Sequence, residues 1–143
     1  ITLTTDIIVG FPGETTQEFE DTLDVLKQVR YDTIFSFIYS RRPGTPAAKM
    51  PDVIDDAEKK ANFNRMLAIQ DEISKEKNLA LEGKVMKVLV EGKSKNNDEF
   101  LAGKTEGGKT VNFKAPDSLI GQFADVEITE AKTWSLTGKL KSQ

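Results

Sequence analysis

The spacing of apolar residues changes at Gly83, and this change constrains the fold more than any other feature of the sequence. Before Gly83, apolar residues recur at helical spacing over two stretches, residues 16–30 and 55–78. After Gly83, apolar and polar residues alternate in short runs, which is typical of half-exposed strands. A chain of 143 residues has room for one ordinary domain, or for a small domain and a piece of another. We therefore predict an α/β part followed by an all-β part.

The first part has the pattern of a strand–helix–strand unit. Thr5 to Phe11 is mostly apolar and rich in β-branched residues, so we expect a parallel strand that is buried on both faces. Thr15 and Glu18 fit a capping box, which starts a helix that ends near Arg30. A second aromatic and β-branched strand is predicted at Thr33–Tyr39. One such unit cannot cover its own sheet, so we expect residues 1–48 to be poorly ordered or to self-associate through their open strand edges.

The second part is predicted to be a small closed barrel that follows a connector helix at Asp55–Asn78. Glu106-Gly107-Gly108 is a hairpin signal between two of its strands. Closure is expected because it removes the exposed strand edges. The five predicted strands are Lys84–Glu91, Phe100–Thr105, Lys109–Lys114, Asp125–Thr129 and Trp134–Leu140.

The composition excludes several kinds of chemistry. The chain has no cysteine, so it cannot form disulfides, zinc–thiolate sites or iron–sulfur ligation. It has no histidine, which removes the usual general base near neutral pH. We assign no catalytic residue and no metal ligand. No apolar run has transmembrane length and no secretory signature is present, so we expect no membrane association and a cytoplasmic location. The absence of an initial Met suggests a cut inside a longer protein.

Two candidate sites follow the predicted strands of the first part. Gly10 and Gly13 allow positive φ angles, and Pro12 stiffens the turn between them. Glu14 would repel a phosphate, so it better suits a ligand hydroxyl or ammonium group, as in a nucleoside or an amino acid. Arg41 and Arg42 follow the second strand at the same end of the sheet and could bind a carboxylate or phosphate group. The alternatives are an ordinary turn and a solvated basic loop.

The barrel carries a third candidate site, made of polar and basic residues. Residues 1–75 have a net charge of −4 and residues 76–143 a net charge of +1, so a polyanion is expected at the second part. Val111 and Phe113 are predicted core residues, which turns Asn112 and Lys114 outward. The loop Lys93-Ser94-Lys95-Asn96-Asn97 lies beside them, and such side chains suit phosphate and 2′-hydroxyl contacts. The alternative is a set of scattered surface lysines.

Other residues of the barrel limit this site. Asp125 and Glu127 are predicted to point outward, so RNA should avoid that side. Phe100 is the only aromatic residue that we consider as a base-stacking platform. Six further aromatic residues are predicted to pack in cores, namely Phe19, Phe35, Phe37, Phe113, Phe123 and Trp134.

The order and spacing of these motifs strongly resemble the radical SAM methylthiotransferases over essentially the whole chain. In the first part the resemblance rests on residues 5–15, 29–32 and 39–47. The second part looks like the TRAM domain of that family, which is a five-stranded, OB-like barrel. The residues that match it are Gly83-Lys84, 88–92, Ser94-Lys95, Gly103-Lys104-Thr105, 111–113, 119–121 and Leu136-Thr137-Gly138.

The resemblance implies a domain organisation and a function. Residues 1–50 would be the C-terminal, incomplete part of a radical SAM (β/α) barrel, 51–80 a connector helix, and 81–143 the TRAM barrel. The Arg42–Pro46 loop and the run 88–95 look like the tRNA branch of the family, because the ribosomal-protein branch tends to have an acidic pair before Gly-Thr-Pro. This implies methylthiolation at position 2 of isopentenyl-adenosine 37 in tRNA, with the anticodon stem-loop as partner. The implied cofactors are S-adenosylmethionine and two 4Fe-4S clusters.

The chain also departs from the family pattern. The Cys-x-x-x-Cys-x-x-Cys motif is absent, so we expect this chain to be inactive alone and to retain tRNA binding only. By position, the S-adenosylmethionine side of the barrel would include Gly10, Gly13, Glu14 and Arg42. Lys104 replaces an arginine, which keeps the charge but loses bidentate hydrogen bonding. The predicted RNA-binding residues are Lys93, Ser94, Lys95, Lys104, Thr105, Asn112 and Lys114. The alternatives are a fragment of a ribosomal-protein methylthiotransferase and a stand-alone module that binds RNA or a small ligand.

Overall fold

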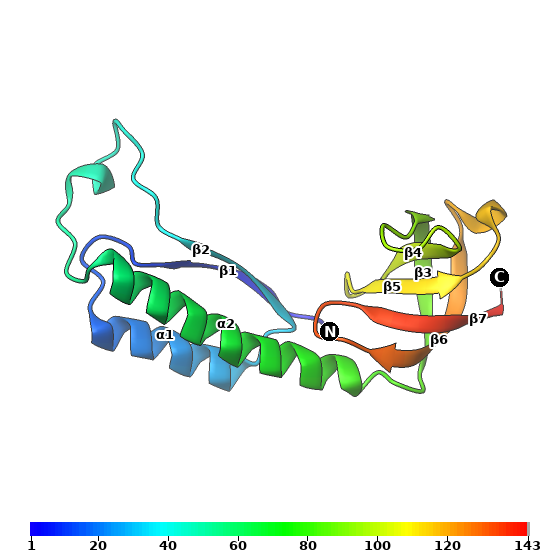
Figure 1. Cartoon of the computed structure of the whole chain (residues 1–143). Coiled ribbons are helices and arrows are strands. Elements are labelled where there is room, and N and C mark those ends of the chain that lie inside the picture. Colours follow the sequence, from blue (N-terminus) through cyan, green and yellow to red (C-terminus); the bar gives the residue numbers. More distant parts are fainter. Residues whose placement is uncertain (143) are drawn as a thin grey trace. The chain divides into compact units, whose positions relative to one another are not determined.

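The computed structural model describes residues 1–142, and Gln143, the last residue of the predicted barrel domain, lies outside the described residues. Two compact units make up the chain (Figure 1). One comprises Leu3–Ile73, and the other comprises Ser74 onward together with Ile1 and Thr2. Within the described residues, no helix combines the length and the hydropathy needed to cross a membrane.

The first unit contains the predicted strand–helix–strand motif. Strands β1 (Thr4–Val9) and β2 (Thr33–Ile38) pair in parallel, with Thr4 opposite Thr33 and Val9 opposite Ile38. Helix α1 (Thr16–Val29) connects them. The predicted capping box is confirmed, because the Glu18 N–H donates to the Thr15 hydroxyl at 3.2 Å and the Thr15 N–H donates to the Glu18 carboxylate at 2.8 Å.

Helix α2 (Asp56–Leu79) supplies cover for this sheet that the sequence interpretation had not assigned. Figure 1 shows α1 and α2 on the same side of β1 and β2. Arg65 of α2 donates to both carboxylate oxygens of Glu20 of α1, at 2.6 and 3.3 Å. The shared core consists of Val9, Phe19, Leu23, Leu26 and Met66. Strands β1 and β2 and helices α1 and α2 therefore form one layered unit. The expectation that residues 1–48 alone are poorly ordered or self-associate stays a prediction.

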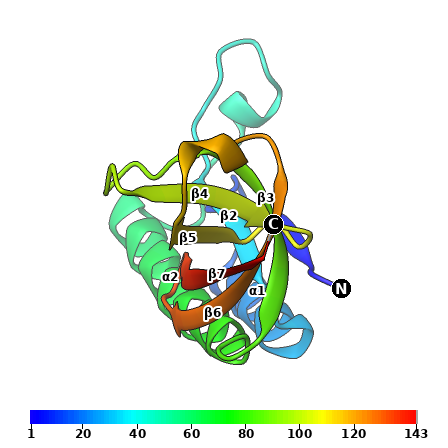
Figure 2. The same ribbon diagram turned by 90° about the vertical axis from the view of Figure 1, so that its right-hand side faces the viewer.

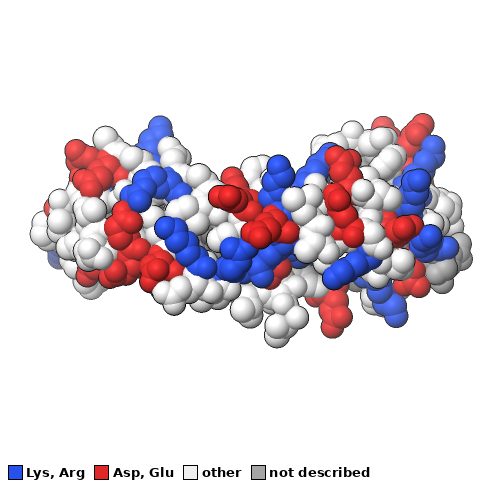
Figure 3. Space-filling model, turned by 90° about the horizontal axis from the view of Figure 1, so that it is seen from below, with Lys and Arg blue, Asp and Glu red and all other residues white. Residues whose placement is uncertain are grey.

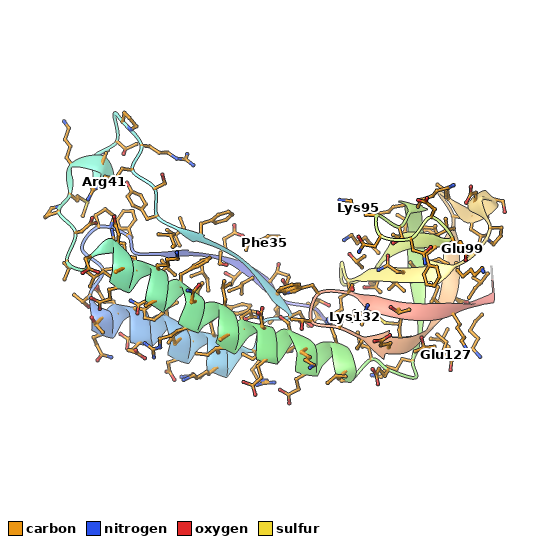
Figure 4. The ribbon with its side chains drawn as sticks, in the orientation of Figure 1. Phe35, Arg41, Lys95, Glu99, Glu127 and Lys132 are labelled. Atoms are coloured by element: carbon orange, nitrogen blue, oxygen red, sulfur yellow. The ribbon has the colours of Figure 1, made fainter. Side chains whose placement is uncertain are left out.

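The other face of the two-stranded sheet is open, which corrects the expectation that β1 is buried on both faces. Ile8 at 53% exposure, Phe35 at 57% and Phe37 at 60% all lie on this face. Phe35 stands on the side of β2 away from α2 (Figure 4). The apolar pattern predicted burial on both faces, but within the described residues helices cover only one of them. The predicted core positions of Phe35 and Phe37 are therefore wrong for this chain.

The second unit is a closed barrel with strand order β3-β4-β5-β7-β6, which confirms the predicted closure (Figure 2). Antiparallel pairing joins β3 to both β4 and β6, β4 to β5, and β6 to β7, whereas β5 and β7 pair in parallel. The predicted hairpin is the β4–β5 connection. The strands are β3 (Val85–Lys93), β4 (Phe100–Thr105), β5 (Thr110–Lys114), β6 (Phe123–Ala131) and β7 (Leu136–Ser142). Short 3-10 turns lie at Ala47–Lys49 and Asp117–Leu119.

The barrel core follows the alternation of side chains along the strands. Val111 and Phe113 are fully buried, as predicted. They pack with Val88, Val90, Leu101, Leu119, Val126, Ile128 and Leu136. Phe123 at 60% exposure and Trp134 at 76% exposure are not core residues, which corrects the sequence interpretation. Trp134 lies outside β7, because that strand begins at Leu136 rather than at Trp134.

Gly103 marks a close approach between two barrel strands. A Cβ at this position would collide with the Leu89 carbonyl oxygen and the Val88 side chain of β3. Gly92, also on the β3–β4 pair, has open space where a Cβ would stand, and its φ angle is not positive. Comparing alanine substitutions at the two glycines therefore distinguishes a steric clash from the loss of backbone conformational freedom.

We expect Gly103→Ala to lower the free energy of unfolding by about 1–3 kcal/mol, because the added methyl group overpacks the closed barrel. Gly92→Ala is the matched control and should change this free energy by less than about 0.5 kcal/mol. Urea denaturation followed by circular dichroism measures both values. Equal stability of the two variants would contradict the close strand packing at Gly103.

Candidate nucleic-acid interface

An open groove of about 490 Å³ lies on the outer surface of the barrel. Its floor includes Gly92 of β3 and Ala102 of β4, which leave space because their side chains are small or absent. One wall is the start of the β3–β4 connection, and the other is the β6–β7 connection. The lining residues are Glu91, Gly92, Lys93, Ser94, Lys95, Asn96, Ala102, Lys104, Thr110, Asn112, Trp134 and Ser135.

The groove brings together five of the seven predicted RNA-binding residues, namely Lys93, Ser94, Lys95, Lys104 and Asn112. Thr105 does not line it. Thr105 is buried, and its hydroxyl accepts a hydrogen bond from the Lys109 N–H at 3.1 Å, which holds the β4–β5 hairpin together. Lys114 lies outside the groove lining and forms an ion pair of 3.2 Å with Glu99.

Ionic and hydrogen-bond partners distinguish the lysines of the groove. The Lys104 ammonium donates to the Thr110 hydroxyl at 2.6 Å, which holds the charge over the outer face of β4 and β5. Lys93 forms an ion pair of 3.4 Å with Asp117. Lys95 is exposed at the start of the β3–β4 connection, from which Glu99 also comes (Figure 4). Because Glu91 adds a negative charge to the lining, the groove has a basic side rather than a uniformly basic surface.

The charges elsewhere on the barrel are mixed. Glu127 of β6 is partly exposed, as predicted, and pairs with Lys141 at 3.0 Å. On the face shown in Figure 3, basic side chains alternate with acidic ones and form no broad patch of one sign. A polyanion therefore has more to gain at the basic side of the groove than on that face.

The sequence interpretation missed Trp134, which lies at the edge of the groove. It was assigned to a strand core because it precedes an alternating run. A signal was present, however, because Trp134 stands between Lys132-Thr133 and Ser135, and a tryptophan among polar residues is more typical of a loop. Phe100, the residue considered for base stacking, is half-buried on β4 and does not line the groove.

In the first unit, polar groups of the Gly10–Glu14 turn form hydrogen bonds within the turn itself. Gly10 and Gly13 have φ angles of 76° and 90°, as their residue types predicted. The Gly10 N–H donates to Glu14 Oε1 at 3.0 Å, and the Glu14 N–H donates to the Phe11 carbonyl at 2.9 Å. The stem of Lys59 packs against Gly10 so closely that a Cβ would not fit there. A structural requirement therefore explains Gly10 without a ligand.

The two arginines of the 40–46 loop differ in their surroundings. Arg41 donates to the carbonyls of Ala48 and Met50 at 2.8 and 2.9 Å, and it pairs with Asp52 at 3.0 Å. Arg41 therefore fixes the shape of the loop. Arg42, the predicted cofactor residue, is exposed. Asp52 also forms an ion pair of 3.0 Å with the buried ammonium group of Lys59. The hydrogen bonds from Lys59 and Arg41 lower the pKa of the Asp52 carboxyl group.

Iron–sulfur ligation does not fit the residues of this chain. Cysteine is absent from the sequence, and residues 1–142 contain no group of three or more acidic, histidine or cysteine side chains that could hold a metal ion.

Comparison with known proteins identifies the unit that carries the groove. Residues 79–141 match the TRAM domain family. This part of the chain is a TRAM domain. The match covers all five barrel strands apart from the end of β7, and it includes every residue that lines the groove.

The similarity to curated proteins extends beyond the TRAM domain. The chain is 56% identical over 140 residues to a tRNA-2-methylthio-N(6)-dimethylallyladenosine synthase of Acetivibrio thermocellus, which covers 98% of this chain and 29% of that protein. It is 54% identical over 140 residues to the protein of that name from Bacillus cytotoxicus, covering 98% of this chain and 28% of that protein. These matches confirm the resemblance to the methylthiotransferases, and the chain spans less than a third of these relatives' length.

Asn78, in the last turn of α2, anchors the TRAM-domain loop that carries Trp134. Its side-chain amide donates to the carbonyls of Lys132 and Thr133 at 2.8 and 3.0 Å, and its carbonyl oxygen accepts from the Lys109 ammonium at 2.6 Å. Asn78 is only 5% exposed. Because these partners come from the β6–β7 loop and from the β4–β5 hairpin, one buried side chain positions one wall of the groove.

We expect Asn78→Ala to lower the free energy of unfolding by about 1–3 kcal/mol, since it removes three hydrogen bonds made by a buried side chain. Asn64, exposed on the same helix, provides the matched control. Asn64→Ala should be neutral or slightly stabilising, because alanine favours helix. Thermal and urea denaturation measure both effects. A neutral Asn78→Ala would contradict the anchoring role.

Proposed function

We propose that this chain is the C-terminal part of an enzyme that methylthiolates isopentenyl-adenosine 37 in tRNA, and that its TRAM domain holds the tRNA. The comparison with known proteins supports this proposal. The curated relatives are named as tRNA-2-methylthio-N(6)-dimethylallyladenosine synthases, and they match nearly the whole chain. We further propose a cytoplasmic location, since the proposed substrate is tRNA.

The observation that carries the RNA-binding proposal is the groove on the TRAM domain. Ammonium groups of Lys95 and Lys104 suit phosphate oxygens, which dominate the affinity of proteins for nucleic acids. The amide of Asn112 and the hydroxyl of Thr110 can accept from and donate to 2′-hydroxyl groups or base edges. All four residues line one groove. We propose the anticodon stem-loop as the RNA element, because the modified nucleotide belongs to it.

The remaining parts of the reaction would come from elsewhere in a longer protein. Ligands for two 4Fe-4S clusters are absent from this sequence, so we propose that the chain has no methylthiotransferase activity by itself. S-adenosylmethionine would supply the radical chemistry when bound beside a cluster. We propose that Gly10, Gly13, Glu14 and Arg42 belong to its binding side. Glu14 uses one carboxylate oxygen within the turn, and the other oxygen can accept from an ammonium or hydroxyl group.

The two-stranded sheet is the proposed route of self-association for the chain alone. Within the described residues, β1 and β2 pair only with each other, so each strand has one open edge. In a longer methylthiotransferase these edges would pair with further barrel strands.

A charge-reversal experiment tests the RNA-binding proposal. We expect the triple variant Lys93→Glu, Lys95→Glu and Lys104→Glu to weaken binding to a tRNA anticodon arm by at least roughly 10-fold, because it removes phosphate contacts and adds repulsion. The slope of log K against log salt should become shallower by about 2, since Lys93 already pairs with Asp117. Filter binding at several salt concentrations measures both quantities.

The control is Lys84→Glu, at an exposed lysine next to β3 that does not line the groove. The RNA affinity of this variant should stay within about 2-fold of that of the unsubstituted chain, and its salt slope should be nearly unchanged. Salt screens a single charge that lies more than a Debye length from the bound RNA. Unchanged binding by the triple variant would overturn the proposed RNA face. If the control lost about one third as much binding free energy as the triple variant, in proportion to the charge removed, only overall charge would matter and the proposed face would be wrong.

A further inference from the structure

The position of Trp134 is unusual for so large an aromatic side chain. Its side chain is 76% exposed, although burial of a tryptophan removes about 150–250 Å² of surface from water and strongly stabilises a core. Phe113 and Leu136, by contrast, are fully buried in the same barrel. Trp134 instead borders the groove together with polar and basic residues. An exposed tryptophan beside a polar groove is a candidate contact surface for a ligand that is itself flat and partly apolar.

The backbone that carries Trp134 is held in place before any ligand arrives. The Lys132 N–H donates to the Ser135 carbonyl at 2.9 Å, which closes the loop around Thr133 and Trp134. The buried amide of Asn78 donates to the carbonyls on the N-terminal side of Trp134. A ring presented from a fixed backbone loses little conformational freedom on binding, which favours affinity.

The rest of the groove has the chemistry that a nucleotide requires around such a ring. Asn112 carries an amide that can donate to and accept from a base edge. Lys104, held by Thr110, and Lys95 provide positive charge for the adjoining phosphates. Ala102 also lines the groove, and its small side chain leaves space for a ligand. The volume of about 490 Å³ falls in the range of sites that hold one small ligand group, roughly 300–1,000 Å³.

We propose that Trp134 is a stacking platform for one unpaired base of single-stranded RNA, with the neighbouring phosphates on the side of Lys95 and Lys104. This inference rests on the proposed RNA-binding function and narrows it to loop nucleotides rather than a stem. A duplex hides the faces of its bases, so it cannot use the ring. Glu91 also interrupts the basic lining, which disfavours a continuous track of duplex phosphates.

A protein partner fits this groove less well than a nucleotide. The core of a protein interface is typically rich in apolar and aromatic residues and poor in charge. Among the described residues that line the groove, Trp134 is the only large apolar one, and its neighbours are lysines, a glutamate, serines and amides.

Tryptophan fluorescence tests the proposal directly, because Trp134 is the single tryptophan of the chain. The probes are an octameric single-stranded RNA, the same sequence in a blunt duplex, and an anticodon-arm hairpin. We expect saturable quenching by the single strand and by the hairpin, and little quenching by the duplex. Stacking of one base on the ring is the cause of the quenching.

Substitution of the ring separates stacking from charge. We expect Trp134→Leu to weaken filter binding of the single strand by roughly 10-fold, while the salt slope stays that of the unsubstituted chain because the phosphate contacts remain. Trp134→Phe should recover part of the affinity, because phenylalanine keeps an aromatic face. Both variants should melt at the temperature of the unsubstituted chain, since the side chain is exposed.

The possible outcomes distinguish this proposal from the function on which it rests. If RNA binds in the filter assay but Trp134→Leu binds as tightly and no quenching occurs, stacking is wrong and the proposed RNA-binding function survives. If the duplex quenches and binds as strongly as the single strand, the preference for unpaired bases is wrong. If none of the three RNAs binds to the unsubstituted chain, both the RNA-binding function and the stacking proposal fail.

Discussion

The closure of the five-stranded barrel sets the arrangement of every other feature of the C-terminal unit. Because side chains alternate along each strand, burying Val111 and Phe113 in the core turns Asn112 outward. The same rule, with burial of Leu101 and Gly103 on β4, turns Ala102 and Lys104 outward beside it. The groove is thus a consequence of the core. Its walls need additional support, and the buried Asn78 supplies it for the loop with Trp134 through two hydrogen bonds. A third hydrogen bond joins Asn78 to Lys109 of the β4–β5 hairpin.

The first unit shows what the same constraint does when a sheet is not closed. Two parallel strands bury one face on α1 and α2, and the opposite face keeps Ile8, Phe35 and Phe37 exposed. The turn after β1 satisfies its own polar groups through Glu14, and Arg41 ties the following loop to Asp52. These local bonds maintain the loop conformations on the proposed cofactor-binding side, even though the sheet has only two strands. This arrangement agrees with a unit that adjoins further strands in a longer methylthiotransferase.

Local rules made much of the fold predictable from sequence. The capping box at Thr15 and Glu18, the alternation around Val111, and the glycines of the β4–β5 hairpin each depend on neighbours within a few residues. The failures depend on distant partners. The polar neighbours of Trp134 indicate a loop, but they do not indicate a groove beside it. The burial of Lys59 likewise requires its ion pair with Asp52 and the absence of a side chain at Gly10, against which its stem packs. Thr105 is an exception, because it has the same strand parity as Leu101 and alternation along β4 therefore indicated its burial. Five of the seven predicted RNA-binding residues do meet in the groove, since strand alternation and the β3–β4 loop place them there.

Chemical-shift mapping with an anticodon stem-loop RNA would locate the nucleotide-binding surface, because it reports the backbone amides and the single indole N–H at once. We expect the shifts to concentrate at the outer faces of β4 and β5, at Lys95, and at the Trp134 indole. The amides of Asp125 and Glu127 on β6 should remain unchanged. Shifts centred on β6, or spread evenly over the lysines of the chain, would contradict a nucleotide site in the groove.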